Sequence, residues 1–276
     1  MFLKRLINNK LGVIVATTLI LVSCQGGTNS GSNTAASADS LNEKQISNEV
    51  KDVVYPLPTP FEMTSMLNGI GAKYIFASLN PVDKAEKYFT EKSKAVCVGV
   101  YGADLAYAAT YDQKQDVNVY SKVLKKLVDQ LGVNIDYSYM LSDDFKKKIN
   151  NKDTLTKIIT NTFYDTYKNL NSKSNPDLAV MMVSGMWVEL MYIATNISDD
   201  TYHYSGLVKI ISDQKESYGK LMKLLNEHNS SAEIKDLEDK LATLKPSFDK
   251  VDKGLSEQDY KVILNNIKSV RKGLVE

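Results

Sequence analysis

The sequence predicts an all-α protein, a helical bundle or short superhelix, and three observations support this fold class. Apolar residues recur every three or four positions along most of the chain after residue 56, as on one face of a helix. A helix-start signal opens this region, where Thr59 can act as an N-cap, Pro60 can occupy the first turn and Glu62 can complete a capping box. No region alternates apolar and polar residues between hairpin turn signals, so we expect no strands.

The first 24 residues predict a secretion leader with a lipid attachment site. A positively charged start precedes an apolar run over 11–22, which is too short for a membrane-spanning helix of about 20 residues. The run ends in Leu21-Val22-Ser23-Cys24, which resembles the bacterial lipobox. We therefore expect a signal peptide over 1–23 and a lipidated Cys24 whose acyl chains anchor the protein to a membrane. The alternative is a plain secretory signal with a chance cysteine.

The segment 24–55 is predicted to be the lipidated cysteine and a flexible tether. Residues 25–40 are almost entirely Gly, Ser, Thr, Asn and Ala, which cannot bury apolar surface. A short helix is possible over 41–52, and the prolines of 55–60 favour an extended entry segment. The rest of the chain, 56–276, is expected to form a single all-helical domain.

The helices after this entry segment follow from their apolar faces. Amphipathic helices are expected over 119–131, 155–170 and 204–225 and over a seam at 234–251, which Pro246 should kink or end. Two stretches, 95–111 and 178–196, are apolar nearly all round, as central helices are. Further helix starts are expected at Asn80-Pro81, Ser142-Asp143-Asp144, Asn175-Pro176 and Ser256–Asp259, and Gly132 is expected to end a helix.

A short internal similarity predicts two duplicated helix-pair units. Residues 104–110 (DLAYAAT) align with residues 189–195 (ELMYIAT) at an offset of 85 residues. The register continues on both sides, with a deletion of one residue downstream, so the repeats span about 95–131 and 180–215. Each unit would contain one very apolar helix followed by one amphipathic helix, and chance similarity is the alternative.

Charge and cysteine content exclude some functions. Removing the three basic residues of the leader leaves 31 basic against 33 acidic residues, a formal charge of −2. A near-neutral surface argues against nucleic acid as a partner, because binding phosphates needs clustered cations. If Cys24 carries lipid, Cys97 remains as a single cysteine in an apolar setting, where a buried and inert thiol is expected.

Asp104 and Glu189 are the strongest candidates for a site, because both are carboxylates inside apolar helices at equivalent repeat positions. If the repeats pack about an approximate two-fold axis, the two can converge and share a proton, bind a cation or act as acid and base. Tyr107 and Tyr192 lie one helical turn along and can contribute hydroxyl groups. The alternative is a structural polar pair that pins the packing, because buried polar groups are usually hydrogen-bonded.

No motif for a metal, a cofactor or a catalytic residue emerges elsewhere. The Glu-x-x-His pairs of a di-metal bundle are missing, since the corresponding positions are tyrosines. His203 and His228 are the only histidines, and we expect each at a solvated helix end. There is no metalloprotease motif, nucleophile elbow or phosphate loop. We therefore predict no metal, no cofactor and no catalytic residue.

Several segments of the first half occur together in a known group of proteins. These are PTPFE at 58–62, LNP at 79–81, GVYGADLAY at 99–107 and LVDQLGV at 127–133. In this combination the chain resembles an uncharacterised family of Bacteroidota lipoproteins, which implies secretion but no reaction. Surface-exported lipoproteins of that phylum tend to carry acidic residues just after the lipidated cysteine. Residues 25–30 carry none, which favours an outer-membrane anchor facing the periplasm.

Three functional hypotheses follow. The first is a non-enzymatic binding or scaffold protein of the cell envelope, with a protein or envelope component held in a groove between the repeats. The second is a periplasmic protein that binds a lipid or other amphiphile between its two apolar helices, because these contain Met181, Met182, Met186 and Met191. The third, ranked last, is an enzyme that uses Asp104 and Glu189.

Overall fold

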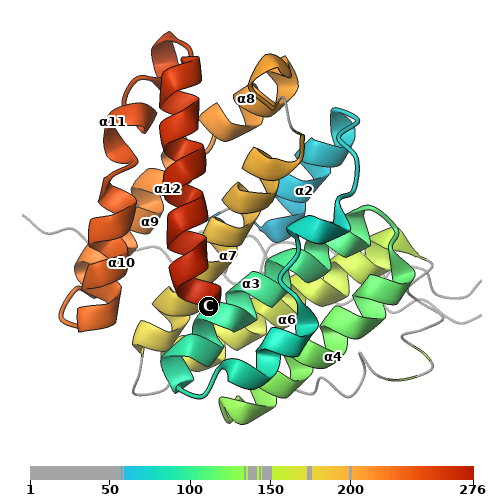
Figure 1. The fold of residues 1–276 in the computed structure, drawn as a ribbon. Coiled ribbons are helices and arrows are strands. Elements are labelled where there is room, and N and C mark those ends of the chain that lie inside the picture. Colours follow the sequence, from blue (N-terminus) through green and yellow to red (C-terminus); the bar gives the residue numbers. More distant parts are fainter. Residues whose placement is uncertain are drawn as a thin grey trace, which may run out of the picture. The chain divides into compact units, whose positions relative to one another are not determined.

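Two long helices, α3 (Glu91–Thr110) and α7 (Pro176–Asn196), lie at the centre of the protein, and the other helices pack around them (Figure 1). The computed structural model describes residues 57, 59–133, 135, 142, 144, 151–172, 176–198 and 201–276. These residues contain ten α-helices, several short 3₁₀ helices and no strand, which confirms the all-α prediction. All of them belong to one compact unit, 47–276.

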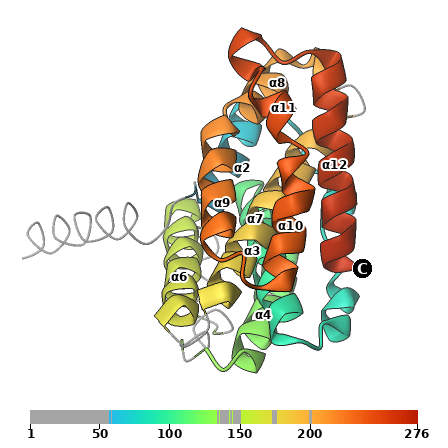
Figure 2. The same cartoon turned by 90° about the vertical axis from the view of Figure 1, so that its left-hand side faces the viewer.

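The remaining helices are arranged in two groups beside this central pair. The described elements, in chain order, are α2 (Pro60–Gly69), η1 (Phe76–Ser78), η2 (Val82–Lys87), α3, α4 (Lys114–Gln130), α6 (Lys152–Ser172), α7, η4 (Thr201–His203), α8 (Ser205–Ser212), α9 (Lys215–Glu227), α10 (Ala232–Ala242), α11 (Lys245–Phe248), η5 (Val251–Lys253) and α12 (Glu257–Val275). Helices α4 and α6 lie to one side of the pair, and α9, α10 and α12 lie to the other (Figures 1 and 2).

The apolar composition of α3 and α7 explains their central position. In α3 every residue from Ala95 to Thr110 is buried, and in α7 only one residue between Leu178 and Thr195 is not. By length and composition α7 is apolar enough to cross a membrane, but 94% of its most apolar stretch is buried inside the folded chain. It is therefore explained as the core helix of a bundle, which confirms the prediction for both stretches.

The two central helices approach each other closely because glycine occupies the crossing on both sides. A Cβ atom added at Gly99 would lie 1.9 Å from the carbonyl oxygen of Met182, and one at Gly185 would lie 2.2 Å from that of Val96. Backbone therefore packs on backbone at this crossing. No space for a ligand remains there, and Met182, Met186 and Met191 are fully buried core residues.

Most of the expected helix ends are present. Thr59 and Glu62 form the predicted capping box of α2, and Ser256 caps α12 by accepting a hydrogen bond from the Asp259 amide. Gly132 follows α4 with a positive φ of 63°, the conformation for which a helix-ending glycine is favoured. The prediction at Asn80-Pro81 is wrong in detail: a 3₁₀ helix follows, and no side chain caps it.

Two predicted helices are interrupted. The expected helix over 204–225 is divided into α8 and α9 at Asp213 and Gln214. Both of these residues keep right-handed helical torsions, so the apolar spacing continues across the break. The break therefore cannot be recognised from the sequence pattern. In the seam over 234–251, α10 ends at Ala242, before Pro246, as predicted. The short helix α11 then follows.

The duplication stays a prediction. In the first unit a single helix, α4, follows the apolar helix, whereas the aligned part of the second unit forms η4 and the shorter α8. The leader, Cys24, the tether, the helix expected over 41–52 and most of the segment around Ser142-Asp143-Asp144 lie outside the described residues.

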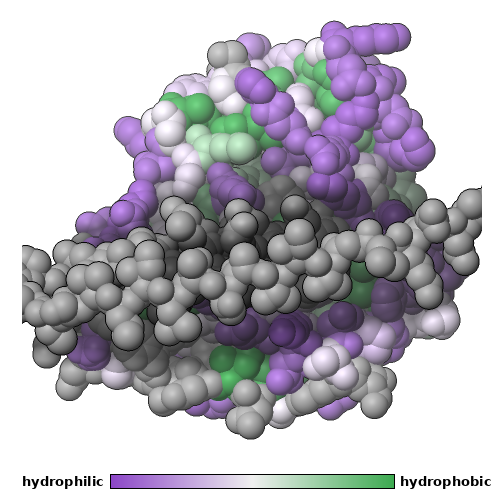
Figure 3. Space-filling view, turned by 180° about the vertical axis from the view of Figure 1, so that it is seen from behind, coloured by the Kyte–Doolittle hydropathy of each residue, from purple (hydrophilic) through white to green (hydrophobic). Residues whose placement is uncertain are grey.

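The outer faces of the bundle are polar. Several lysines pair with an acidic residue one helical turn away, for example Lys209 with Asp213, Lys235 with Asp239 and Lys245 with Asp249. Seen from behind, the coloured surface is largely hydrophilic, with separate hydrophobic patches (Figure 3). Such exposed pairs favour solubility and contribute little to stability.

The helix crossing gives a first prediction. Gly99→Ala should lower the free energy of unfolding by about 3 kcal/mol, because the methyl group forces backbone apart in a close-packed core. Urea titration of the purified protein measures this. Gly219→Ala is the matched control, because a Cβ at this position of α9 meets nothing within 4 Å and should stabilise the helix. Equal effects of the two substitutions would show that the crossing is loose.

Candidate functional site

Asp104 and Glu189 meet in the interior, as the sequence suggested they can. Asp104 lies in the carboxyl-terminal half of α3 and Glu189 in the carboxyl-terminal half of α7, and both residues are 0% exposed. The two carboxyl groups are close enough that the charge of Glu189 raises the pKa of Asp104. Among the described residues, Oδ1 of Asp104 has no hydrogen-bond partner, and only Oδ2 accepts a hydrogen bond.

Arg271 of α12 supplies the positive charge that faces this pair. Its guanidinium binds Glu189 in a bidentate manner, with Nε 2.6 Å from Oε2 and Nη2 2.7 Å from Oε1. Nη2 also lies 3.4 Å from the carbonyl oxygen of Ser78. The Tyr192 ring lies against the guanidinium, with Cζ 3.9 Å from the ring centroid, which adds a cation–π contact.

The loop between η1 and η2 also contacts Asp104. The Asn80 amide donates to Oδ2 of Asp104 at 3.1 Å, and the Tyr120 hydroxyl donates to the Asn80 carbonyl at 3.0 Å. The Asn80 side chain in turn donates to the Tyr88 hydroxyl, which donates to the carbonyl of Val275 at the end of α12. The loop therefore links Asp104 to Tyr120 of α4 and, through Tyr88, to the end of α12.

Of the two carboxyl groups, Asp104 is the one that binds a proton more readily. Burial raises the pKa of Asp104 well above its ordinary value of 3.8, and the nearby Glu189 charge raises it further. Burial also raises the pKa of Glu189, but the hydrogen bonds and charge of Arg271 oppose this effect. Burial disfavours the Arg271 charge, yet the contacts with Glu189 raise the pKa of the guanidinium overall. A neutral Asp104 beside a Glu189–Arg271 ion pair leaves the core without net charge.

The two predicted tyrosines lie in different places. Tyr192 joins the cluster through Arg271. Tyr107 does not: its hydroxyl accepts from the Ile75 amide at 3.0 Å and donates to the Lys73 carbonyl at 3.2 Å. It therefore holds the loop before η1 against α3, and its ring packs beside those of Tyr74 and Tyr111.

Sequence reasoning missed Arg271, although the composition contains a signal for it. The chain has 34 Lys and Arg residues, and only Arg5 and Arg271 are arginines. Arg5 lies in the predicted leader, so the rest of the chain uses lysine for every other positive charge. A guanidinium can bind a carboxylate through two parallel hydrogen bonds while stacking on a ring, which an ammonium cannot do.

The buried cluster has the chemistry of a structural element. Neither carboxylate lines the groove described below, and the described residues include no group of three or more potential metal ligands. Both carboxyl groups are fully buried, so a molecule in the groove does not contact them. The geometry thus matches the structural alternative, in which a polar pair fixes how helices pack.

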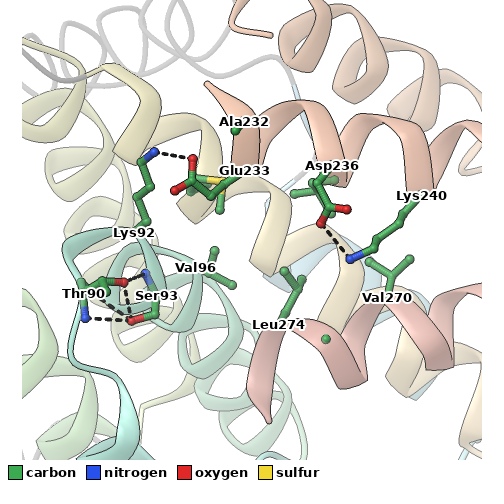
Figure 4. Close-up of a pocket in the computed structure, with 13 residues that line it drawn as sticks. Thr90, Lys92, Ser93, Val96, Ala232, Glu233, Asp236, Lys240, Val270 and Leu274 are labelled. Carbon is green, nitrogen blue, oxygen red and sulfur yellow. Dashed lines mark hydrogen bonds and ion pairs between the residues drawn. The ribbon is translucent and has the colours of Figure 1, made fainter. Parts of the chain in front are cut away.

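The groove lies instead between α3, α7, α10 and α12 and has a volume of about 590 Å³ (Figure 4). Its floor is apolar, and polar side chains surround its mouth. The floor is formed by the buried or half-buried Val96, Met181, Leu237, Val270 and Leu274. The mouth is formed by Thr90, Lys92, Ser93, Glu233, Asp236 and Lys240, together with the exposed Ala232 and Gly273. Of the four methionines considered from the sequence, Met181 alone lines it.

The remaining predicted positions behave as expected. Cys97 is buried, and burial raises the pKa of its thiol to about 12, so it stays protonated. His228 is the C-cap residue of α9, and its Nδ1 lies 3.2 Å from Asp177 of α7. His203 lies in η4 and is exposed.

The chain was compared with models of protein families, with curated proteins and with solved structures, and none of the three comparisons gave a match.

The buried pair predicts an unusual pH dependence. The folded chain keeps a proton on Asp104 that the unfolded chain releases above about pH 4, so the folded state binds more protons. The free energy of unfolding should fall as pH rises from there through the raised pKa, by up to about 1.4 kcal/mol per pH unit. Asp104→Asn imitates the neutral acid and should remove this contribution. Urea titrations at about pH 5 and about pH 8 measure it; identical slopes for both proteins would contradict a protonated Asp104.

The ion pair predicts unequal effects of two substitutions. Glu189→Gln should cost about 3 kcal/mol, because it leaves Arg271 without its counter-charge in a largely buried position. Arg271→Lys should cost about 2 kcal/mol, because it keeps the charge but loses one of two charge-assisted hydrogen bonds. Denaturant titration gives both values.

An exposed ion pair provides the control for these two variants. Lys245 of α11 pairs with Asp249, and its side chain is 67% exposed. Lys245→Gln should leave the unfolding midpoint unchanged within error. A loss as large as that of the buried variants would mean that the buried position of Arg271 is not what makes it important.

Proposed function

We propose that this chain is a lipid-anchored, non-enzymatic binding or scaffold protein of the bacterial cell envelope. The observation that carries the binding role is the groove between α3, α7, α10 and α12, because a preformed concave apolar site is the usual form of a binding site. The anchor rests on the lipobox at 21–24 and on the tether that follows it. The partner is a protein or another envelope component.

The groove lies on a framework that suits binding. Three of its four walls belong to helices that meet at the buried cluster, since α3 carries Asp104, α7 carries Glu189 and α12 carries Arg271. The groove therefore requires no rearrangement of the core before an occupant enters. A preorganised site loses little conformational entropy on binding.

A small amphiphile is the second candidate, and the apolar floor favours it. From the sequence such a ligand was expected between the two apolar helices, but the backbone contact at Gly99 leaves no room for it there. Met181 at the floor of the groove supports an amphiphile as the ligand, because a methionine side chain adapts to irregular apolar ligands. The enzyme hypothesis receives no support, since Asp104 and Glu189 are sealed away from the groove.

The proposed location is the outer membrane, with the folded part facing the periplasm. The absence of acidic residues over 25–30 supports this face. With an acyl anchor on Cys24, metabolic labelling with a fatty-acid analogue marks the protein, and Cys24→Ala removes the label and releases the protein from the membrane fraction. An unlabelled wild-type chain would contradict the anchor.

Photo-crosslinking in intact bacteria tests the binding role. A photoreactive amino acid replaces Lys240 at the groove mouth or, as the control, Lys220 on α9. The two lysines match closely, because each pairs with an acid four residues earlier and their side chains are 51% and 48% exposed. A discrete adduct of defined mass is expected at position 240 and not at 220. Equal adducts at both positions, or none at either, would contradict a binding groove.

A further inference from the structure

The polar groups around the groove already satisfy one another. Lys92 on α3 reaches across to α10, where its Nζ lies 2.6 Å from Glu233 and 3.1 Å from the Ser231 hydroxyl. Asp236 and Lys240 pair at 2.7 Å on α10 (Figure 4). The groove mouth is therefore spanned by paired charges whose hydrogen-bonding groups are engaged within the protein.

The hydroxyl groups at the mouth are engaged as well. Thr90 and Ser93 form the capping box of α3, with each side chain bonded to the backbone amide of the other. Below this level the side chains of the floor are aliphatic, apart from the thioether of Met181. An extended peptide would leave its own amide and carbonyl groups without partners there, at about 1–3 kcal/mol for each buried group.

The charges around the mouth balance. Lys92 and Lys240 face Glu233 and Asp236, so the mouth has two positive and two negative groups and no net charge. A strongly anionic head group meets two carboxylates, and a cationic one meets two ammonium groups. An uncharged or zwitterionic head group is the kind that this arrangement does not repel.

We propose that the groove binds a single alkyl chain of an uncharged or zwitterionic lipid, with the head group outside the paired charges. The inference rests on the proposed function, because it names the class of envelope component that the groove takes. Three observations carry it: an apolar floor supplied by four helices, a mouth whose polar groups are already paired, and a volume within the range of about 300–1,000 Å³ that small-ligand sites occupy. A flexible alkyl chain needs no hydrogen bond from the floor and conforms to its shape.

Gly273 makes the groove easy to fill without touching the core. It is an exposed residue of α12 that lines the groove, and a Cβ there would meet only the Nζ of Lys240, at 3.9 Å. Gly273→Leu therefore places an isobutyl group in the path of the alkyl chain. Gly219→Leu is the matched control, because Gly219 is also an exposed helical glycine and a Cβ there meets nothing within 4 Å.

The test is calorimetric titration of the purified mature protein with a short-chain lysophosphatidylcholine below its micelle concentration. Wild type and Gly219→Leu should bind one molecule with equal affinity, and Gly273→Leu should bind at least tenfold more weakly. Thermal unfolding of the three proteins shows that the variants are folded. The inference is wrong if wild type does not bind, or if Gly273→Leu binds as tightly as wild type.

Two further measurements separate this inference from the proposal on which it rests. An alkyl sulfate of the same chain length should bind no more tightly than the zwitterion, and a preference of tenfold or more for the anion would overturn the assignment of the head group. If the crosslinker at position 240 captures a protein while the lysolipid fails to bind, the alkyl inference fails and the binding role stands. If both fail, both are wrong.

Discussion

Two carboxyl groups enclosed in an apolar core impose the main constraint on this protein. Asp104 and Glu189 lie on the two helices that form the centre, and neither is exposed to solvent. A buried charge is strongly unfavourable unless a counter-charge and hydrogen bonds accompany it. One proton and one guanidinium meet this need, and the guanidinium comes from the last helix of the chain. The position of α12 is thus set by chemistry at the centre of the bundle.

The same helix connects the interior to the surface. Arg271 faces the carboxylates, while Val270, Gly273 and Leu274 of the same two turns line the groove. The ion pair and one wall of the groove therefore depend on the same helix. The helices α3 and α7, which line the groove as well, are in backbone contact at Gly99 and Gly185.

The sequence predicted what depends on local pattern. The all-round apolarity of 95–111 and 178–196 placed α3 and α7 at the centre, and the residues around Thr59 and Ser256 defined helix starts through short-range hydrogen bonds. The meeting of Asp104 and Glu189 was proposed from their matching positions in a suspected repeat. The packing brings them together, although that repeat remains a hypothesis.

The features that depend on contacts between distant residues could not be predicted from the sequence. Arg271 is separated from Glu189 by 82 residues, and no periodicity links the two. The groove depends on the spacing of α10 and α12 relative to α3, which side-chain pattern does not encode. The break between α8 and α9 was hidden because two residues with helical torsions preserve the apolar register across it. The only feature of the sequence that distinguishes residue 271 is the rarity of arginine among so many lysines, and this feature was not used.

The long separation between the acids and the arginine bears on how the chain acquires its structure. A polypeptide that emerges from its amino-terminal side presents both acids well before the residue that neutralises them. The buried ion pair therefore forms only after a contact of high sequence separation has been made, and contacts of this kind are associated with slower folding. Under the proposed export, this late contact would help the chain to cross the membrane, because a translocation channel accepts an incompletely folded chain.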